Sequence, residues 1–314
     1  MHRSCLLFVL LLAASLPMRA HAALSCTYSP GLMDFGTLTS PVPQTNNTPN
    51  PTLSCTGGGS GTQNLCVTIG SGSGGGTIPR LMSSGANTLQ YQIYFDSAHS
   101  IPWGDNSAGG FEGQQVAITL DGAGSGTLSL PLYGQIFAQS VASGTYASSG
   151  LAIAIKTKPG GSPCHSGSGG NVGTGILNTK VLIGASCTIS ASNIDFGTTS
   201  SLASAIPSSG SLSVNCTSGA AYTIAMNAGT SAGNTVAARK MSIGGTGAGV
   251  IGYQLYQSNS PLGTPWGDGT SGTFTELGTG TGSTQTIPVY AQIPVQATPA
   301  TGSYFDTVTA TITY

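Results

Sequence analysis

The stretch CTYSPGLMDFG, residues 26–36, decides the fold because it recurs as CTISASNIDFG, residues 187–197. A second cysteine follows each copy at the same distance, Cys55 after the first and Cys216 after the second. Each landmark is therefore repeated 161 residues later, the step from 26 to 187. Further matches follow in the same order: residues 91–94 with 253–256, 102–105 with 265–268, and 130–136 with 287–293. Ordered repetition of this kind indicates two homologous domains.

The first 22 residues have the features of a secretory signal peptide. His2 and Arg3 form a short basic start, an apolar run covers 6–16, and the sequence Ala20-His21-Ala22 is a small-x-small cleavage site. The apolar run is too short to span a bilayer comfortably, and no later stretch approaches the ~20 apolar residues that a span needs. We therefore expect cleavage after Ala22 and an exported mature protein.

The cysteines predict three disulfides. Cleavage removes Cys5 and leaves six, an even number in an oxidising compartment. The repeat and then elimination give the expected pairs, which are Cys26–Cys55, Cys187–Cys216 and Cys66–Cys164. The alternative, a lipoprotein acylated on Cys26, would leave Cys55 without a partner, so the disulfide is favoured.

The composition combines very little charge with ample apolar content. Charged residues make up 5% of the chain and hydrophobic residues 39%, a balance opposite to that of disordered proteins. The mature chain has six basic and nine acidic residues, which are scattered, so neither nucleic acid nor an anionic membrane is an expected partner. Because so little charge disfavours solubility of a free monomer, we expect the protein to live in an assembly or under escort.

Alternating polar and apolar residues, interrupted by Gly-rich turns, predict an all-β fold with two immunoglobulin-like β-sandwich domains in tandem. The expected divisions are a signal peptide at 1–22, an N-terminal domain at 23–183 and a C-terminal domain at 184–314. In the first copy the expected strands lie near residues 24–37, 51–56, 62–70, 88–96, 127–137 and 144–155.

The two copies end differently. The second stops at Tyr314, at the close of the strand that matches 144–155 in the first copy, so it is expected to lack its last strand. The first copy continues through a Gly/Pro/Ser-rich stretch at 159–175 into 176–183, which could be its own seventh strand. The inward-facing residues of that strand would be Leu177, Thr179, Val181 and Ile183.

A sandwich without its last strand exposes unpaired backbone groups and an apolar cleft. Strand addition by another chain is a known way to fill such a cleft. The expected groove residues are Ile189, Ile194, Phe196, Val308, Ala310, Ile312 and Tyr314. The alternative is that these residues form an ordinary closed core.

The combined motifs resemble the spore coat protein U domain family. They are the Cys-x7-Asp-Phe-Gly opening, Tyr-Gln-Leu-Tyr at 253–256, Trp-Gly-Asp at 266–268, Val-Tyr-Ala-Gln-Ile at 289–293 and the alternating final strand. The resemblance implies a subunit of an archaic chaperone/usher pilus, and two domains imply the tip adhesin, which attaches cells to surfaces in biofilms. Implied partners are a periplasmic chaperone, an outer-membrane usher and an adjoining pilin that donates a strand. The implied location is the pilus tip, reached through the periplasm.

The start of the mature chain also suggests the tip. Cleavage after Ala22 leaves only Ala23, Leu24 and Ser25 before Cys26, which is too short for a donor strand. We therefore expect a subunit that accepts a strand and does not donate one.

Candidate binding residues lie in the loops of the first domain, at 57–61, 97–126 and 157–175, which should gather at its outer pole. We expect contact with an abiotic hydrophobic surface or a host ligand through Ile101, Pro102, Val141, His99 and His165. The Cys66–Cys164 bridge, absent from the second copy, either presents one of these loops or simply staples it. Trp103, Phe111, Asp34 and Asp105 have counterparts in the second copy and are expected to serve the fold.

No catalytic residues, metal or cofactor are expected. The chain has no Gly-x-Ser-x-Gly, His-Glu-x-x-His or phosphate-loop motif. A metal site built from His99, His165 and Asp105 is a weak alternative, because isolated loop histidines are usually solvated. Two other functions remain open: a lectin-type carbohydrate-binding adhesin, and a structural coat or matrix protein.

Overall fold

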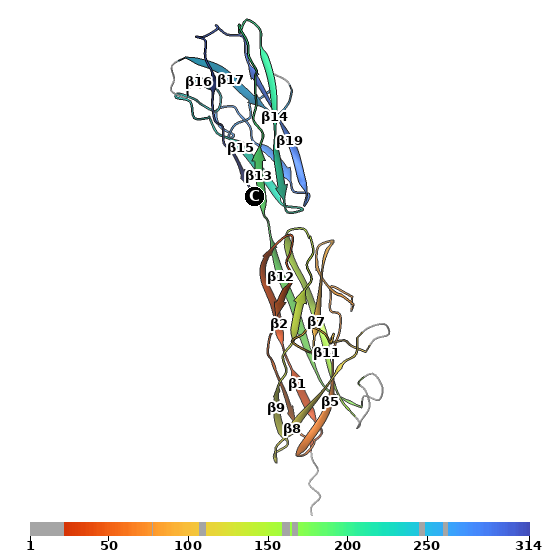
Figure 1. The fold of residues 1–314 in the computed structure, drawn as a ribbon. Coiled ribbons are helices and arrows are strands. Elements are labelled where there is room, and N and C mark those ends of the chain that lie inside the picture. Colours follow the sequence, from red (N-terminus) through yellow and green to blue (C-terminus); the bar gives the residue numbers. More distant parts are fainter. Residues whose placement is uncertain are drawn as a thin grey trace, which may run out of the picture.

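The computed structural model describes residues 22–76, 78–106, 111–158, 164, 169–244, 249–259 and 263–314. Every regular element in these ranges is a β-strand, and the strands form two successive domains (Figure 1). The described part of the chain contains no helix of the length and apolarity that crossing a membrane would require. Residues 1–21, most of the expected signal peptide, lie outside the described residues.

The first domain contains twelve strands in one connected sheet system. The hydrogen-bonded order is β3-β10-β7-β6-β11-β12-β1-β4-β9, with β2 paired to β12 and β5 paired to both β11 and β8. The strands are β1 (Ser25–Tyr28), β2 (Gly31–Thr39), β3 (Thr45–Asn47), β4 (Thr52–Thr56), β5 (Gly61–Ile69), β6 (Arg80–Ser84), β7 (Asn87–Tyr94), β8 (Gln114–Leu120), β9 (Ser125–Ser129), β10 (Tyr133–Ile136), β11 (Gly144–Thr157) and β12 (Asn171–Gly184).

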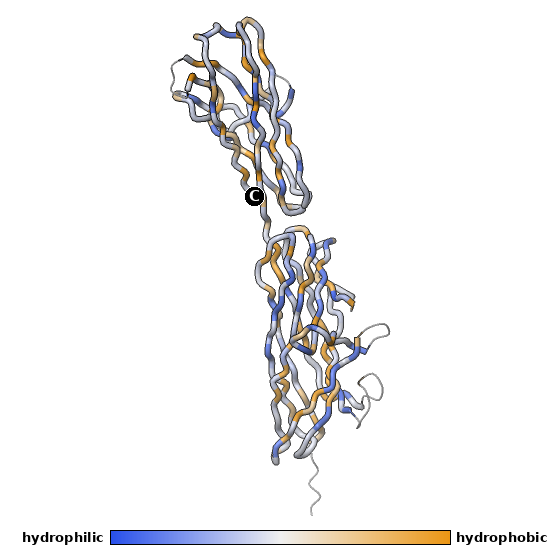
Figure 2. Tube along the Cα trace, viewed as in Figure 1, coloured by the Kyte–Doolittle hydropathy of each residue, from blue (hydrophilic) through white to orange (hydrophobic). Residues whose placement is uncertain are grey.

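Strand β12 is the last strand of this domain and lies in its middle. It runs antiparallel to β11 and parallel to β1 and β2. Its sequence alternates, and the inward side chains Leu177, Thr179, Val181 and Ile183 are at most 1% exposed. The alternation is visible as a change of hydropathy from residue to residue along the strands (Figure 2). The first domain therefore closes its sandwich with a strand of its own.

The segment 97–126, expected to be a loop, contains β8. The sequence there, QQVAITL, alternates, and Val116, Ile118 and Leu120 are buried against the first core. Strand β8 pairs with β5 along its whole length, from Val67 to Gly61. The expected outer loop is thus shorter, because residues 114–120 add a strand to the sheet.

The second domain has nine strands in two sheets, ordered β13-β14-β19-β17-β16-β20 and β18-β15-β21. Among the described residues, β13 pairs with β14 alone and β21 pairs with β15 alone. One hydrogen-bonding edge of each is therefore unpaired. The strands are β13 (Cys187–Ala191), β14 (Ile206–Cys216), β15 (Ala221–Met226), β16 (Arg239–Ile243), β17 (Val250–Tyr256), β18 (Glu276–Thr279), β19 (Thr284–Ile293), β20 (Tyr304–Phe305) and β21 (Ala310–Thr313).

The repeated motifs serve the same structural roles in both domains. Cys26 lies opposite Cys55 on the β1/β4 pair and Cys187 lies opposite Cys216 on β13/β14, and each pair forms a disulfide with a Cα–Cα distance of 4.1 Å. The Asp-Phe-Gly segments form the same turn: the Gly36 amide donates to Asp34 at 2.9 Å, and Gly197 donates to Asp195 at 2.8 Å. These shared residues hold the fold.

A buried arginine, not anticipated from the sequence, is also repeated. Arg80 and Arg239 are both at most 1% exposed. Arg80 donates to the backbone oxygens of Ile69 and Trp103 at 2.6 and 2.7 Å and to the side chain of Gln92. Arg239 donates in the same way to the side chain of Gln254 and to backbone oxygens of β15 and the loop after it. Each guanidinium satisfies several carbonyls that would otherwise be buried without a partner.

The domains meet end to end, and only Ala185 and Ser186 separate β12 from β13 (Figure 1). The amide of Ser143 donates to the carbonyl of Ser218 at 3.1 Å across the junction. Beside this contact is a cleft of about 480 Å³, lined by Ser40, Pro41, Ser140 and Val141 of the first domain and by polar residues of the second.

Candidate functional site

The segment that contains Asp-Phe-Gly is covered by a neighbouring strand in the first domain and is left uncovered in the second. In the first domain β2 lies beside β12, and Met33 and Phe35 are buried. Their counterparts 161 residues later are Ile194 and Phe196, which follow β13 in a segment without strand pairing. Both are only partly buried. The same positions thus lose their cover because the second domain has no equivalent of β12 among its described residues.

The opposite wall shows the same difference. Strand β11 is paired with β12, and its inward side chains Leu151, Ile153 and Ile155 are at most 1% exposed. The matching residues before and in β21 are Val308, Ala310 and Ile312, which pack against the second core but remain partly exposed. The match is supported by strand register, since Ile155 lies opposite Val67 in the first domain and Ile312 lies opposite Ile224 in the second.

A groove of about 830 Å³ lies beside the first of these walls, at Ile194 and Phe196, and does not extend to the second. Its sides are formed by residues 194–200 and 298–306, and residues of β16 and β17 also line it. These two strands lie in the part of the domain away from the junction (Figure 1). The apolar side chains that line it are Ile194, Phe196, Leu202, Ile206, Met241, Ile251, Ile293, Pro299, Ala300 and Phe305.

The structure distributes the seven expected groove residues unequally. Ile194 and Phe196 line the groove. Ile189, Val308, Ala310 and Ile312 lie toward the junction, where β13 and β21 approach one another and pack on the core. Tyr314 is 57% exposed. Met241 and Ile251 were missed because they lie on β16 and β17, far from both edge segments in sequence. Met82 and Leu89 hold the equivalent places in the first copy and lie opposite each other in the same way. A comparison of the two copies could therefore have identified Met241 and Ile251.

An acidic residue lies on the groove wall. Asp306 accepts hydrogen bonds from the amides of Thr230 and Ser231 at 2.8 and 2.9 Å, from Asn234 at 3.0 Å and from the Tyr253 hydroxyl at 2.7 Å. Partial burial alone would raise the pKa of Asp306, but these hydrogen bonds, led by that from Tyr253, lower it below its ordinary value. Burial and the same carboxylate raise the pKa of Tyr253. The groove wall therefore carries a fixed negative charge.

Three of the candidate binding residues lie in one tight loop of the first domain. The carboxylate of Asp96 accepts hydrogen bonds from the amides of Ser100 and Ile101, at 3.0 and 2.7 Å, and shapes the loop. Ile101 is 45% exposed. His99 is edge-on to Tyr94 with ring centroids 5.1 Å apart, and Pro102 is partly buried. The loop thus presents one aliphatic side chain outward.

The remaining candidates do not join this loop. Val141 was expected at the outer pole but lies at the junction, where its amide donates a hydrogen bond to the Ser40 hydroxyl at 3.1 Å. The reason is that the segment after β10 returns toward the second domain before β11 begins. His165 lies outside the described residues.

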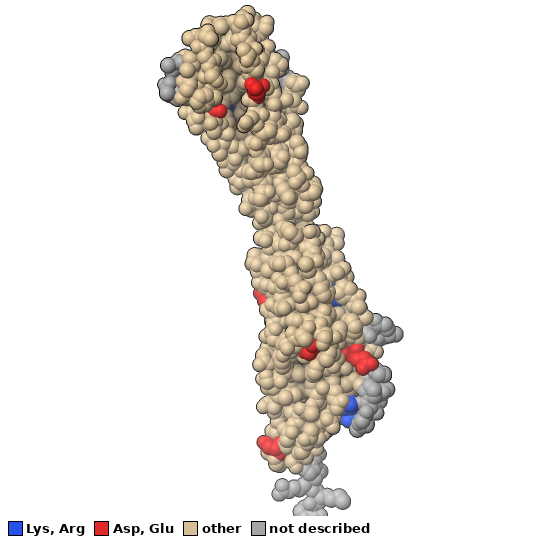
Figure 3. Space-filling model, viewed as in Figure 1, with Lys and Arg blue, Asp and Glu red and all other residues tan. Residues whose placement is uncertain are grey.

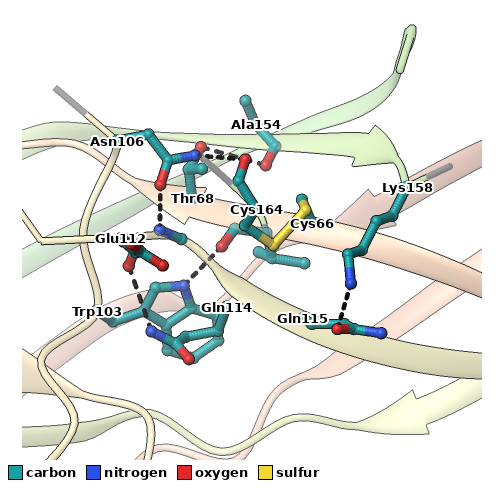
Figure 4. Close-up of a disulfide and its surroundings, with 12 residues drawn as sticks. Cys66, Thr68, Trp103, Asn106, Glu112, Gln114, Gln115, Ala154, Lys158 and Cys164 are labelled. Atoms are coloured by element: carbon teal, nitrogen blue, oxygen red, sulfur yellow. Dashed lines mark hydrogen bonds between the residues drawn. A yellow bond between two sulfur atoms is a disulfide. The ribbon is translucent and has the colours of Figure 1, made fainter. Parts of the chain in front are cut away.

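The third disulfide joins Cys66 on β5 to Cys164, with a Cα–Cα distance of 5.5 Å (Figure 4). Asn106 lies beside it: its side-chain amide donates to the Cys164 carbonyl at 3.2 Å and accepts from the Gly113 amide at 2.5 Å. The bridge therefore links β5 to the segment after β11, and Asn106 ties the loop after Trp103 to the same point.

Charged groups are sparse on the surface, as the face in Figure 3 shows. Among the described residues there is no group of three His, Cys, Asp or Glu side chains that could hold a metal ion. The one ion pair found there joins Lys180 to Asp34 at 3.0 Å on the outside of β12 and β2.

Comparison with known proteins gives both a family and a set of similar folds. The family model of the Spore Coat Protein U domain matches residues 12–150 and again 174–311. No match was found among curated protein sequences.

Three solved structures are similar. A chain in the CsuC–CsuE chaperone–tip adhesion subunit pre-assembly complex from archaic chaperone-usher Csu pili of Acinetobacter baumannii gives a TM-score of 0.50 at 18% identity, covering 92% of this chain and 100% of that chain. The CupB6 tip adhesin of Pseudomonas aeruginosa gives 0.41 at 14% identity, covering 93% and 95%. CfaE, the adhesive subunit of the CFA/I fimbria of enterotoxigenic Escherichia coli, gives 0.36 at 11%, covering 90% and 92%. At 18% identity the first of these likenesses concerns the fold alone.

Proposed function

Because the chain belongs to the Spore Coat Protein U domain family, we propose that it is the tip adhesin of a chaperone/usher pilus. In this proposal the first domain attaches cells to surfaces, as in biofilm formation, and the second accepts a strand from the adjoining subunit. The observation that carries the proposal is the difference between the two copies. Positions that β12 covers in the first domain border an open groove in the second.

The physical reason for strand acceptance is the state of the two unpaired edges. Strands β13 and β21 each have one edge without backbone partners among the described residues, and the apolar side chains between them are half-covered. A donor strand that lies in the groove and continues between β13 and β21 would satisfy the backbone groups of both strands and bury the apolar surface together. In the periplasm a chaperone would fill this place first, and at the outer-membrane usher the next subunit would replace it.

The first domain has a different role in this proposal. Its own β12 occupies the position that remains open in the second domain, so it has no need of a donor strand. A subunit with one closed domain and one acceptor groove suits the end of a fibre. The scarcity of charge and the outward Ile101 favour contact with an apolar abiotic surface, although a host ligand at the same loops fits as well.

The test is binding of a donor-strand peptide to the mature chain. A peptide with alternating apolar residues should raise the melting temperature of the second domain by roughly 10 °C when present at about a hundred times its Kd. The two domains can be followed separately because each has one buried tryptophan, Trp103 in the first and Trp266 in the second. A Trp103→Phe variant reports on the second domain alone.

A scrambled peptide of the same composition is the control and should leave both transitions unchanged. If no alternating peptide shifts the Trp266 transition, the groove is not an acceptor and the proposal is wrong.

A further inference from the structure

The first domain contains a bound example of the strand that the second domain needs. Residues 173–183 of β12, called here the template strand, lie between β11 and the β1/β2 side, and their inward positions alternate. In order from the N-terminal end, the inward residues are Gly173, Gly175, Leu177, Thr179, Val181 and Ile183. Along the strand the series begins with two glycines, continues with Leu177 and the small polar Thr179, and ends with two aliphatic side chains.

The N-terminal end of the template strand is closed to side chains. A Cβ atom at Gly173 would lie 2.0 Å from the Cys26 carbonyl oxygen, and one at Gly175 would lie 1.8 Å from the Tyr28 carbonyl oxygen. Backbone atoms cannot move aside as a flexible side chain can. Only glycine therefore fits where β12 passes the disulfide-bearing strand β1.

The second domain repeats this closed end. Cys187 and Ile189 of β13 take the places of Cys26 and Tyr28, and the Cys187–Cys216 bridge has the same Cα–Cα distance of 4.1 Å. The groove of about 830 Å³ does not reach these residues; its lining begins at Ile194. An incoming strand would thus meet a narrow passage beside β13.

The place of the C-terminal half of the template strand is filled in the first domain, whereas the equivalent place in the second domain is open. The groove is lined by Ile194, Phe196, Met241 and Ile251, whose counterparts are the fully covered residues Met33, Phe35, Met82 and Leu89. In the first domain the pairing of β12 with β2 places Thr179 opposite Met33 and Ile183 opposite Leu38, so the C-terminal half of the template strand lies beside the segment that holds Met33 and Phe35. The empty volume therefore lies where the template strand carries Val181 and Ile183.

The middle position is polar. Thr179 lies opposite Ser148 on β11, and its hydroxyl donates to the Ser148 carbonyl at 3.4 Å. In the second domain Asp306 takes the place of Ser148 and lines the groove. An acidic side chain at the Thr179 position of an incoming strand would be repelled by this carboxylate, whereas a hydroxyl can approach it.

We infer that the groove selects a donor strand with the pattern Gly-x-Gly-x-aliphatic-x-Thr/Ser-x-aliphatic-x-aliphatic, read from the N-terminus. The strand runs antiparallel to β21 and parallel to β13, as β12 runs relative to β11 and β1. The partner is a subunit whose N-terminal segment carries this pattern. The inference rests on the proposed strand acceptance and adds the order of side-chain sizes.

The experiment uses fluorescently labelled peptides and the full mature chain, with binding followed by anisotropy. The parent peptide is the template sequence itself, GTGILNTKVLIG, residues 173–184. The Gly175→Leu peptide should bind at least about tenfold more weakly because of the closed end, and the Val181→Ser/Ile183→Ser peptide should lose a similar factor through lost apolar burial. The Thr179→Asp peptide should also weaken, and Thr179→Ser should not.

Two controls locate the site. The Ile176→Ser/Leu182→Ser peptide changes the outward side chains, which are 58% and 41% exposed in the first domain, and should bind like the parent. An Ile194→Lys variant of the full chain, altered only in the open groove of the second domain, should not bind the parent peptide. Binding that survives Ile194→Lys would show exchange into the first domain and overturn the assignment.

The outcomes separate this inference from the proposal beneath it. If alternating peptides bind but Gly175→Leu binds as well as the parent, the size order is wrong while strand acceptance stands. If neither the parent nor any other alternating peptide binds, both fail.

Discussion

At the scale of single residues, Asp306 is the clearest difference between the two copies. The first domain has Ser148 at this place, where its hydroxyl accepts from the Gly74 amide at 3.0 Å. In the second domain the Asp306 carboxylate accepts the equivalent hydrogen bonds from the neighbouring loop. It also accepts hydrogen bonds from the side chains of Tyr253 and Asn234. Asp306 therefore holds the loop at 230–234 to the strand that forms one groove wall.

We predict that Asp306→Asn destabilises the second domain by about 1–3 kcal/mol, because one oxygen acceptor becomes a donor facing other donors. Urea unfolding of the single-tryptophan chain that keeps Trp266 measures this change. The first domain, read through Trp103, should not change. An unaltered second domain would mean that water replaces these hydrogen bonds at no cost.

The same carboxylate makes the stability of the second domain depend on pH. The pKa of Asp306 in the folded state lies below its ordinary value of 3.8. Its contribution is therefore complete above the unfolded-state pKa and disappears as the pH falls through the folded-state pKa. Stability of the second domain should fall below about pH 4 in the native chain and fall less in Asp306→Asn, which the same urea titrations would detect.

At the scale of elements, β12 separates a closed domain from an open one. It contacts β11, β1 and β2 at once, so its inward side chains join both walls of the sandwich. Its outward side carries the Lys180–Asp34 pair and exposed aliphatic residues. The two sides of one strand thus predict opposite sensitivities to substitution.

Neighbouring substitutions in β12 test this. Val181→Asp places a charge in the buried core and should destabilise the first domain by about 3 kcal/mol or more. Leu182→Asp changes the next residue, which is 41% exposed, and should alter stability by no more than about 0.5 kcal/mol. Chemical unfolding followed through Trp103 distinguishes them. Equal effects would show that β12 is not held in the observed register.

At the scale of the whole molecule, the chain is an elongated pair of domains with little charge on its surface (Figure 3). The Ile101 loop lies on the first domain and the open groove at the far end of the second. In the proposed fibre, adhesion and assembly therefore take place at separate parts of the molecule and should respond to separate mutations.

We expect Ile101→Lys to reduce attachment of cells to polystyrene several-fold, because a charged side chain resists transfer to an apolar surface. The matched control is Val250→Lys, which changes a residue of similar exposure, 42% against 45%, on the second domain. Both variants should assemble and fold normally. If the two attach equally well, Ile101 is not part of the contact surface.

The sequence predicted the features that are local or repeated. Alternation indicated the β class, the repeat paired Cys26 with Cys55, and the inward series of β12 was readable from residues 176–183. Each depends on spacing along the chain. Strand β8 also alternates, but it lies within residues 97–126, which we expected to form a loop.

The tertiary structure decided the features that depend on contacts between segments distant in sequence. It placed Val141 at the domain junction, buried Arg80 and Arg239 among carbonyl groups, and added Met241 and Ile251 to the groove. The spacing of nearby residues cannot reveal such contacts, because β16 and β17 reach the groove through sheet pairing with strands far along the chain. The repeat thus determined by itself that two domains share one framework. Only the folded arrangement showed which side chains line the open groove and how far each is covered, because the cover of a side chain depends on its neighbours in space.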